Sequence, residues 1–381
     1  MYAVALLGGS IHVNADGRAT EQGIDPHVVS ANSMPERDAL LRNAERALIR
    51  GDTAAAVSAL EQAATMRHAA DTEMGLVRAA MQAGDYRQAL AFCAHTAGAH
   101  LDSAAAGALY AWLLRAGGQE LSARRALDVA LAQAPQDPVV EATRRAFDNV
   151  TFFASGVLLD TPHRMAPYML IDGAHDLSPG ARMATGGVLI DGGRRALVPN
   201  AGIEGAKRVW VINGLGRAAE ATVAPGFDRL RSQGIAVLQL SETLLVGDVL
   251  LAPRDPFAGS PGFVVGYGPA TPATPAWPTI RQGFLRKLDG PDGLREVGIE
   301  LPVGSGGGAA VLDAAGRVAG ITMPGASGSI AMLPVSMFRE LERTPTSASG
   351  PPHPPAPSVR IPMDQAYEHG LKSALQVLIW P

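Results

Sequence analysis

The sequence predicts a multidomain α plus β protein, in which an α-α helical repeat array precedes a unit built of β-strands. In the Ala-rich residues 35–149, apolar side chains follow helical spacing and a short motif recurs. Residues 150–343 are rich in Gly, Pro and short β-branched runs, which are typical of strands. Residues 344–362 form a Pro-rich linker, and residues 363–381 return to helical spacing. Residues 1–34 precede these parts as an N-terminal segment.

The composition excludes several classes of function. Of the 381 residues, 47% are apolar and 18% are charged, so the chain can build sizeable cores. The formal net charge of −4 argues against a nucleic-acid partner, because surfaces that bind nucleic acids are basic. No apolar run reaches the roughly 18 residues that span a membrane. Cys93 is the single cysteine, and its apolar neighbours predict a buried thiol without disulfide, redox or metal chemistry.

The N-terminal segment bears on localisation. Residues 2–9 are apolar, and Val13 and Ala15 give residues 13–15 the small-x-small pattern of a signal-peptidase site. We therefore expect an exported, periplasmic protein of bacterial type. Because no basic stretch stands before the apolar residues, a cytoplasmic location is the alternative.

A repeat organises the Ala-rich part. Gly51, Gly84 and Gly118 are 33 and 34 residues apart, and an Ala stands five residues after each of them. Gly ends a helix without steric cost, and the small Ala lets the next helix pack closely. A helix-turn-helix of this period resembles the tetratricopeptide repeat, and a further capping helix is expected at about residues 138–148. A generic helical bundle is the alternative.

Five segments of the β-rich part carry a resemblance to a known family. In chain order they read GGVLID (186–191), ALVPNAGI (196–203), IAVL (235–238), AAVLDAAGRVAGI (309–321) and LPVS (333–336). Together they resemble the trypsin-like serine peptidases, particularly the bacterial high-temperature-requirement branch. The resemblance implies a trypsin-like double β-barrel for residues 150–343.

The resemblance also says where catalytic groups would stand. In the family a Ser attacks, a His takes its proton and an Asp orients the His. Carried over segment by segment, the His position falls on Gly202, the Asp position on Gly234 and the Ser position on Gly307. Glycine supplies none of the three groups, so the resemblance implies a catalytically inactive member, a pseudoprotease. The alternative is an active serine endopeptidase that uses Ser305 with an unrecognised base.

No cofactor or metal site is expected. His175 stands beside Asp172 and Asp176, but a polar loop explains this cluster better than a metal site. The favoured function is therefore non-catalytic protein or peptide binding. Helical repeats of this kind offer a groove to a partner.

Two further segments are candidate binding elements. The resemblance implies that Ile321, Thr322 and Met323 pair with the backbone of a peptide, which requires no triad. Residues 363–380 are expected to form one amphipathic helix, which docks on its own barrel or binds a partner through Tyr367, Leu371, Leu375 and Leu378. In a third interpretation the protein is a structural subunit of a larger assembly.

Overall fold

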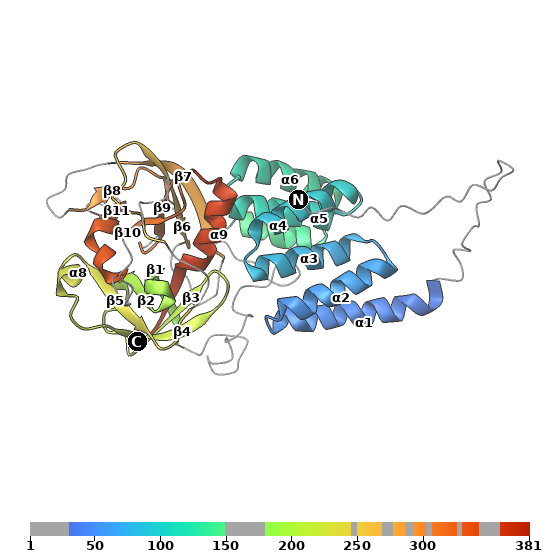
Figure 1. The fold of residues 1–381 in the computed structure, drawn as a ribbon. Helices are drawn as coiled ribbons and strands as arrows, with labels where there is room; N and C mark the ends of the chain where they lie inside the picture. Colours follow the sequence, from blue (N-terminus) through green and yellow to red (C-terminus); the bar gives the residue numbers. More distant parts are fainter. Residues whose placement is uncertain are drawn as a thin grey trace, which may run out of the picture.

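The computed structural model describes residues 30–148, 180–244, 250–268, 277–286, 293–301, 307–325, 330–342 and 359–381. In these residues a stack of helices lies beside a β-region, and helix α9 (Met363–Ser373) lies between the two (Figure 1). The predicted fold class, a helical repeat array followed by a double β-barrel, is confirmed, and the β-region consists of a closed six-stranded barrel and a six-stranded barrel-like sheet. Within the same residues, the helices are too short or too polar to cross a membrane. The N-terminal residues 1–29 and most of the predicted linker, up to residue 358, lie outside the described residues.

The helical array consists of consecutive antiparallel helices. They are α1 (Ser30–Ile49), α2 (Thr53–Met66), α3 (Ala70–Ala83), α4 (Tyr86–Ala99), α5 (Ala104–Ala116), α6 (Glu120–Gln133) and α7 (Pro138–Asp148). Gly51, Gly84 and Gly118 lie in the turns within the helix pairs, as the repeat predicted, and all three have positive φ. Asp52 caps α2 by accepting a hydrogen bond from the backbone N–H of Ala55 at 3.0 Å. Helix α7 matches the expected capping helix.

The first β unit is a closed barrel with the strand order β1-β12-β3-β4-β5-β2. Its strands are β1 (Arg182–Ile190), β2 (Arg195–Pro199), β3 (Arg208–Asn213), β4 (Ala218–Val223), β5 (Ile235–Leu240) and β12 (Ala374–Trp380). Short helix α8 (Asp228–Ser232) lies between β4 and β5. The strand that closes this barrel therefore comes from the C-terminal end of the described chain.

The second β unit is a six-stranded sheet with the order β7-β6-β9-β10-β11-β8. Its strands are β6 (Ser260–Gly266), β7 (Thr279–Leu285), β8 (Arg295–Glu296), β9 (Ala310–Asp313), β10 (Val318–Pro324) and β11 (Ile330–Pro334). Leu285 of β7 shares a buried cluster with Val297 and Ile299, which follow β8. The sheet is thus strongly curved, and its two edges approach each other.

The C-terminal segment differs from the expected single helix. Helix α9 ends at Ser373, and residues 374–380 form strand β12, so the prediction of a helix up to Trp380 is wrong. Strand β12 pairs with β1 on one side and with β3 on the other. Its apolar run is buried on both faces, and such runs are typical of central strands. Pairing with strands distant in sequence overrides the local helical spacing.

The array and the β-region share one continuous core. The rings of Tyr86 in α4 and Tyr367 in α9 meet edge to face, with centroids 4.6 Å apart. Trp112 of α5 meets Trp277 of the β-region in the same way at 5.9 Å. All four side chains are buried and belong to one hydrophobic cluster that also reaches both β units. Helix α9 therefore joins the repeats to the β-region.

Candidate functional site

Two of the three glycines at the predicted triad positions lie beside the ends of neighbouring barrel strands. Gly202 ends the 3-10 turn η4 (Asn200–Gly202), which directly follows β2. Gly234 directly precedes β5, and β2 and β5 pair along their length. The backbone N–H of Asn200 donates to the carbonyl of Gly234 at 2.7 Å. The barrel thus fixes these two positions beside each other.

Gly307 reaches the same place from the second β unit. It lies three residues before β9, and its carbonyl accepts from the N–H of Gly186 at 3.3 Å and from Oγ1 of Thr185 at 3.4 Å. Thr185 and Gly186 belong to β1 of the barrel. Gly307 therefore lies where the two β units meet.

The side chains of Thr185 and Met323 connect the three glycines. A Cβ atom added at Gly202 would lie 2.6 Å from Cγ2 of Thr185. A Cβ at Gly234 would lie 3.0 Å from Cε of Met323, and a Cβ at Gly307 would lie 3.3 Å from Cα of Met323. Both Thr185 and Met323 are buried. The structure brings the three predicted positions together and places a threonine and a methionine between them.

The backbone at two of these positions also disfavours a side chain. Gly234 has φ of +80° and Gly307 has φ of +84°, both in the left-handed region. Residues with a Cβ adopt this region at a cost of about 1–3 kcal/mol. Aspartate at Gly234 or serine at Gly307 would require a strained backbone or a local rearrangement.

The segment expected to pair with a peptide is paired within the chain. The N–H of Thr322 donates to the carbonyl of Ala309 at 2.9 Å, and its carbonyl accepts from the N–H of Gly308 at 2.7 Å. Its hydroxyl accepts from the N–H of Ala309 at 2.8 Å. On the other side Ile321, Thr322 and Met323 pair with β11. In the described residues, Ile321, Thr322 and Met323 are thus already paired within the chain, and their pairing with a peptide stays a prediction.

The sequence also singled out Ser305, as the alternative nucleophile, and His175. Both of these residues lie outside the described residues. The amides of Gly308 and Ala309, which lie just after Ser305 in the sequence, donate to Thr322 and are not free to bind an oxyanion.

His369 is the only histidine in the described part of the β-region. Its Nδ1 lies 3.3 Å from the carbonyl of Gly316 in the β9–β10 turn.

The predicted partner-binding residues are buried within this chain. Tyr367, Leu371, Leu375 and Leu378 are at most 2% exposed. The hydroxyl of Tyr367 donates to the carbonyl of Pro278 at 2.7 Å. These side chains pack between the array, α9 and the barrel, so in this structure the segment docks within its own chain, which was one of the two predicted alternatives, and offers these residues to no second protein.

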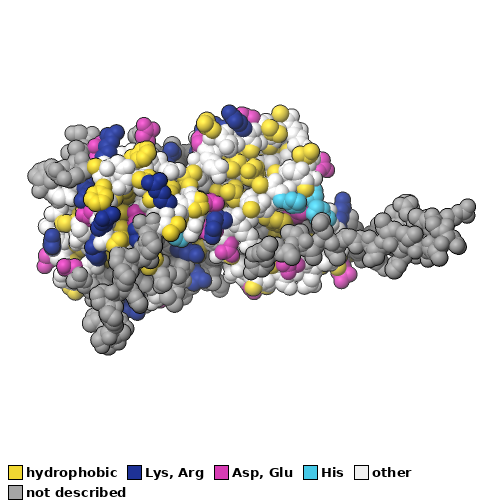
Figure 2. Space-filling view, turned by 45° about the horizontal axis from the view of Figure 1, so that its top comes forward, with side chains coloured by type: hydrophobic (Ala, Val, Ile, Leu, Met, Phe, Trp, Pro, Cys, Tyr) yellow, Lys and Arg dark blue, Asp and Glu magenta, His cyan; other side chains and the backbone are white. Residues whose placement is uncertain are grey.

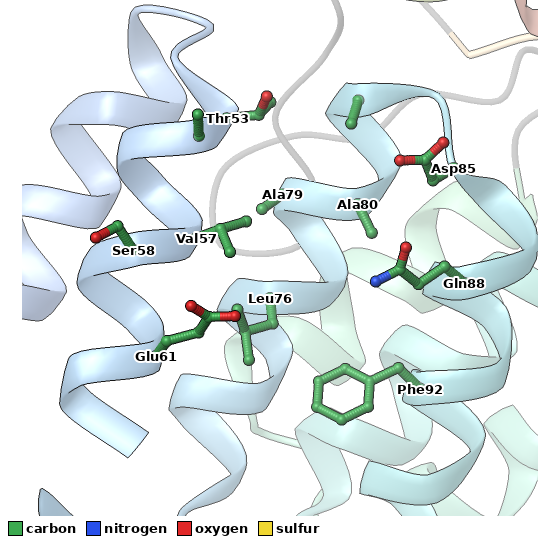
Figure 3. Close-up of a pocket in the computed structure, with 12 residues that line it drawn as sticks. Thr53, Val57, Ser58, Glu61, Leu76, Ala79, Ala80, Asp85, Gln88 and Phe92 are labelled. Atoms are coloured by element: carbon green, nitrogen blue, oxygen red, sulfur yellow. The ribbon is translucent and has the colours of Figure 1, made fainter. Parts of the chain in front are cut away.

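A groove on the helical array was not predicted residue by residue. Helices α2 and α4 form its walls and α3 forms its floor, and its volume is about 570 Å³ (Figure 3). Its lining is formed by Thr53, Ala54, Val57, Ser58, Glu61, Leu76, Ala79, Ala80, Ala83, Asp85, Gln88 and Phe92. This set contains two carboxylates, Glu61 and Asp85, and no Lys, Arg or His. Helix packing over three elements creates the groove, which the repeat period alone could not locate.

Comparisons with known proteins bear on both parts of the chain. Residues 47–113 match the family model described as tetratricopeptide repeat, which confirms the predicted repeats over these residues. No curated protein matches the chain. A solved structure of the HtrA-type protease AlgW with decapeptide is 18% identical, with a TM-score of 0.34, and the match covers 42% of this chain and 50% of AlgW. The chain thus spans half the length of that protein. The apo MamO protease domain from Magnetospirillum magneticum is 14% identical, with a TM-score of 0.32, and the match covers 44% of this chain and 97% of that domain.

Proposed function

We propose that this protein is a non-catalytic, protein-binding pseudoprotease, whose helical repeats hold a peptide segment of a partner. The observation that carries the non-catalytic part is the convergence of Gly202, Gly234 and Gly307 around Thr185 and Met323. A serine nucleophile works only when a base removes its proton and a third group orients that base. Glycines at all three positions supply none of these groups.

The groove between α2 and α4 is the binding surface of this proposal. Alanines and the side chains of Val57, Leu76 and Phe92 give it an apolar lining, while Glu61 and Asp85 add negative charge. An apolar segment with interspersed Lys or Arg side chains complements both properties. The partner we propose is therefore a basic, amphipathic peptide segment.

Binding of short fluorescent peptides to the full chain tests the groove. A peptide in which Leu and Lys alternate should bind more tightly than one in which Leu and Glu alternate. Glu61→Lys should weaken binding of the Leu-Lys peptide on the order of five-fold, which corresponds to about 1 kcal/mol for a partly exposed charge. Asp128→Lys is the matched control, because Asp128 is an exposed acid on α6 outside the groove. Equal effects of the two variants, or no preference between the peptides, would contradict the groove assignment.

An active serine endopeptidase that uses Ser305 is the alternative function. Hydrolysis of labelled casein by the full chain distinguishes the two functions. We expect no turnover above that of a Ser305→Ala variant. Hydrolysis that Ser305→Ala removes would establish the enzyme instead.

The cellular location is a separate proposal. The apolar residues 2–9 favour export to the periplasm, where a scaffold of this kind could form part of a larger assembly. Fractionation of cells that make the chain with its native N-terminus tests this location. Recovery in the cytoplasmic fraction would contradict it.

A further inference from the structure

Two histidines and a glutamate from separate segments of the helical array meet at one place. His68 lies between α2 and α3, Glu73 lies in the first turn of α3, and His100 directly follows α4. Nε2 of His68 lies 2.5 Å from Oε1 of Glu73, and Nε2 of His100 lies 3.5 Å from Oε2 of the same carboxylate. Figure 2 shows histidine side chains gathered at one place on the surface of the array.

The polar atoms at this place are incompletely satisfied. Glu73 is only 5% exposed, yet its Oε2 has no hydrogen-bond partner. Nε2 of His100 is likewise buried without a hydrogen-bond partner. Arg37, the cation beside this segment, instead pairs with Asp71 and donates to Oγ1 of Thr72 at 2.7 Å. A buried, charged carboxylate with an unsatisfied oxygen lowers the stability of the folded chain unless a cation compensates its charge.

We infer that His68, Glu73 and His100 form a binding site for a divalent transition metal of the zinc type. Zinc accepts imidazole nitrogen and carboxylate oxygen at about 2.0–2.1 Å, which places tetrahedral ligand atoms roughly 3.3 Å from one another. One ligand atom from each of the three residues lies within 4.8 Å of the others, so small rotations of the side chains bring them to that spacing. The side chain of His68 is 65% exposed, which leaves a path for the ion and for a water as fourth ligand.

The site would fasten the helices that form the groove. Its ligands tie the α2–α3 connection and the start of α3 to the end of α4, and these three helices line the groove. This cluster was not among the candidate sites predicted from the sequence, and residues 68 and 100 are 32 positions apart in successive repeats. None of the three ligands lines the groove or contacts the three glycines, so this inference stands independently of the proposed function.

Titration of the chelator-treated full chain with Co²⁺ tests the site, because tetrahedral Co²⁺ absorbs visible light and replaces Zn²⁺. The wild type should bind one Co²⁺ per chain with that absorption. His68→Ala should lower the affinity for Co²⁺ by at least about ten-fold. Replacement of a residue that only hydrogen-bonds to a metal ligand already lowers metal affinity by about ten-fold or more. Glu73→Gln should do the same. His95→Ala is the matched control, because His95 is an exposed histidine of α4 outside the cluster and should leave binding unchanged.

Two results would overturn the inference. One is a wild type that binds no Co²⁺. The other is binding by His68→Ala and Glu73→Gln with the affinity of the wild type, which would place the ion elsewhere. His68→Ala alters an exposed side chain and should fold, and circular dichroism of each variant checks this. Zn²⁺ should also raise the melting temperature of the wild type and of His95→Ala, but not that of His68→Ala.

Discussion

At the scale of single residues, the left-handed backbone of Gly307 makes a direct prediction about stability. Gly307→Ser, which would place a hydroxyl at the predicted nucleophile position, should lower the free energy of unfolding by about 1–3 kcal/mol. The strain adds to the contact of the new Cβ with Cδ of Pro324, which would be only 3.0 Å away. Urea denaturation of the purified chain measures the change.

The control for this variant is a glycine without such constraints. Gly98 lies in α4, and a Cβ added there would meet nothing within 4 Å. Gly98→Ala should raise the free energy of unfolding by about 0.5–1 kcal/mol, because alanine favours the helix. A Gly307→Ser variant as stable as the wild type would mean that the loop adopts another conformation.

Cys93 is predicted to be unreactive in the folded chain. Its side chain is buried, and burial together with the charge of Glu73 raises the pKa of the thiol. Because the thiolate is the reactive form, a thiol reagent near neutral pH should modify Cys93 only after denaturant unfolds the chain. Rapid modification of the native chain would show that the array opens around α4.

At the scale of elements, the repeats and the C-terminal segment show what local sequence can reveal. The repeats were predictable, because Gly51, Gly84 and Gly118 mark turns between neighbouring helices. Strand β12 was not, because its partners β1 and β3 lie more than 160 residues earlier, as Leu375 pairs with Gly187 and Asn213. The sequence of a short apolar run does not show which distant strands it will pair with.

The candidate site was also only partly predictable from the sequence. The sequence singled out Gly202, Gly234 and Gly307 through their places beside predicted strands, because the patterns of those strands are local. It gave no sign of Thr185 and Met323, since their role depends on how the two β units dock. The cluster of His68, Glu73 and His100 was hidden for a related reason, because it forms only when successive repeats stack.

Strand β12 makes a prediction about the barrel. Leu375 is fully buried, and Leu375→Asp would place a carboxylate in the barrel core. We expect a loss of at least about 3 kcal/mol in the free energy of unfolding, measured by urea denaturation. The control is Val359→Asp, since Val359 is 73% exposed and its replacement should change stability by less than about 0.5 kcal/mol. If both variants unfold at the same urea concentration, β12 does not close the barrel in solution.

At the scale of the whole molecule, the shared core predicts that the array and the β-region unfold together. Besides the aromatic contacts of α9, Leu215 in the β3–β4 turn packs against Gly84 of the array. Calorimetry of the wild type should show one cooperative transition. Leu215→Asp should separate it into two, whereas Leu121→Asp, at a position 76% exposed on α6, should not. Two transitions in the wild type would mean that the two parts are independent domains.

The central proposal concerns the same whole molecule: the β-region is non-catalytic, because Gly202, Gly234 and Gly307 stand at the positions predicted for the three catalytic groups. Intact mass spectrometry after incubation with a fluorophosphonate tests this most directly, because the reagent attaches only to a serine that a base has activated. We predict that the mass of the full chain stays unchanged, as the positions of Gly202, Gly234 and Gly307 imply. Addition of one phosphonyl group, lost in Ser305→Ala, would contradict the account and establish a working nucleophile.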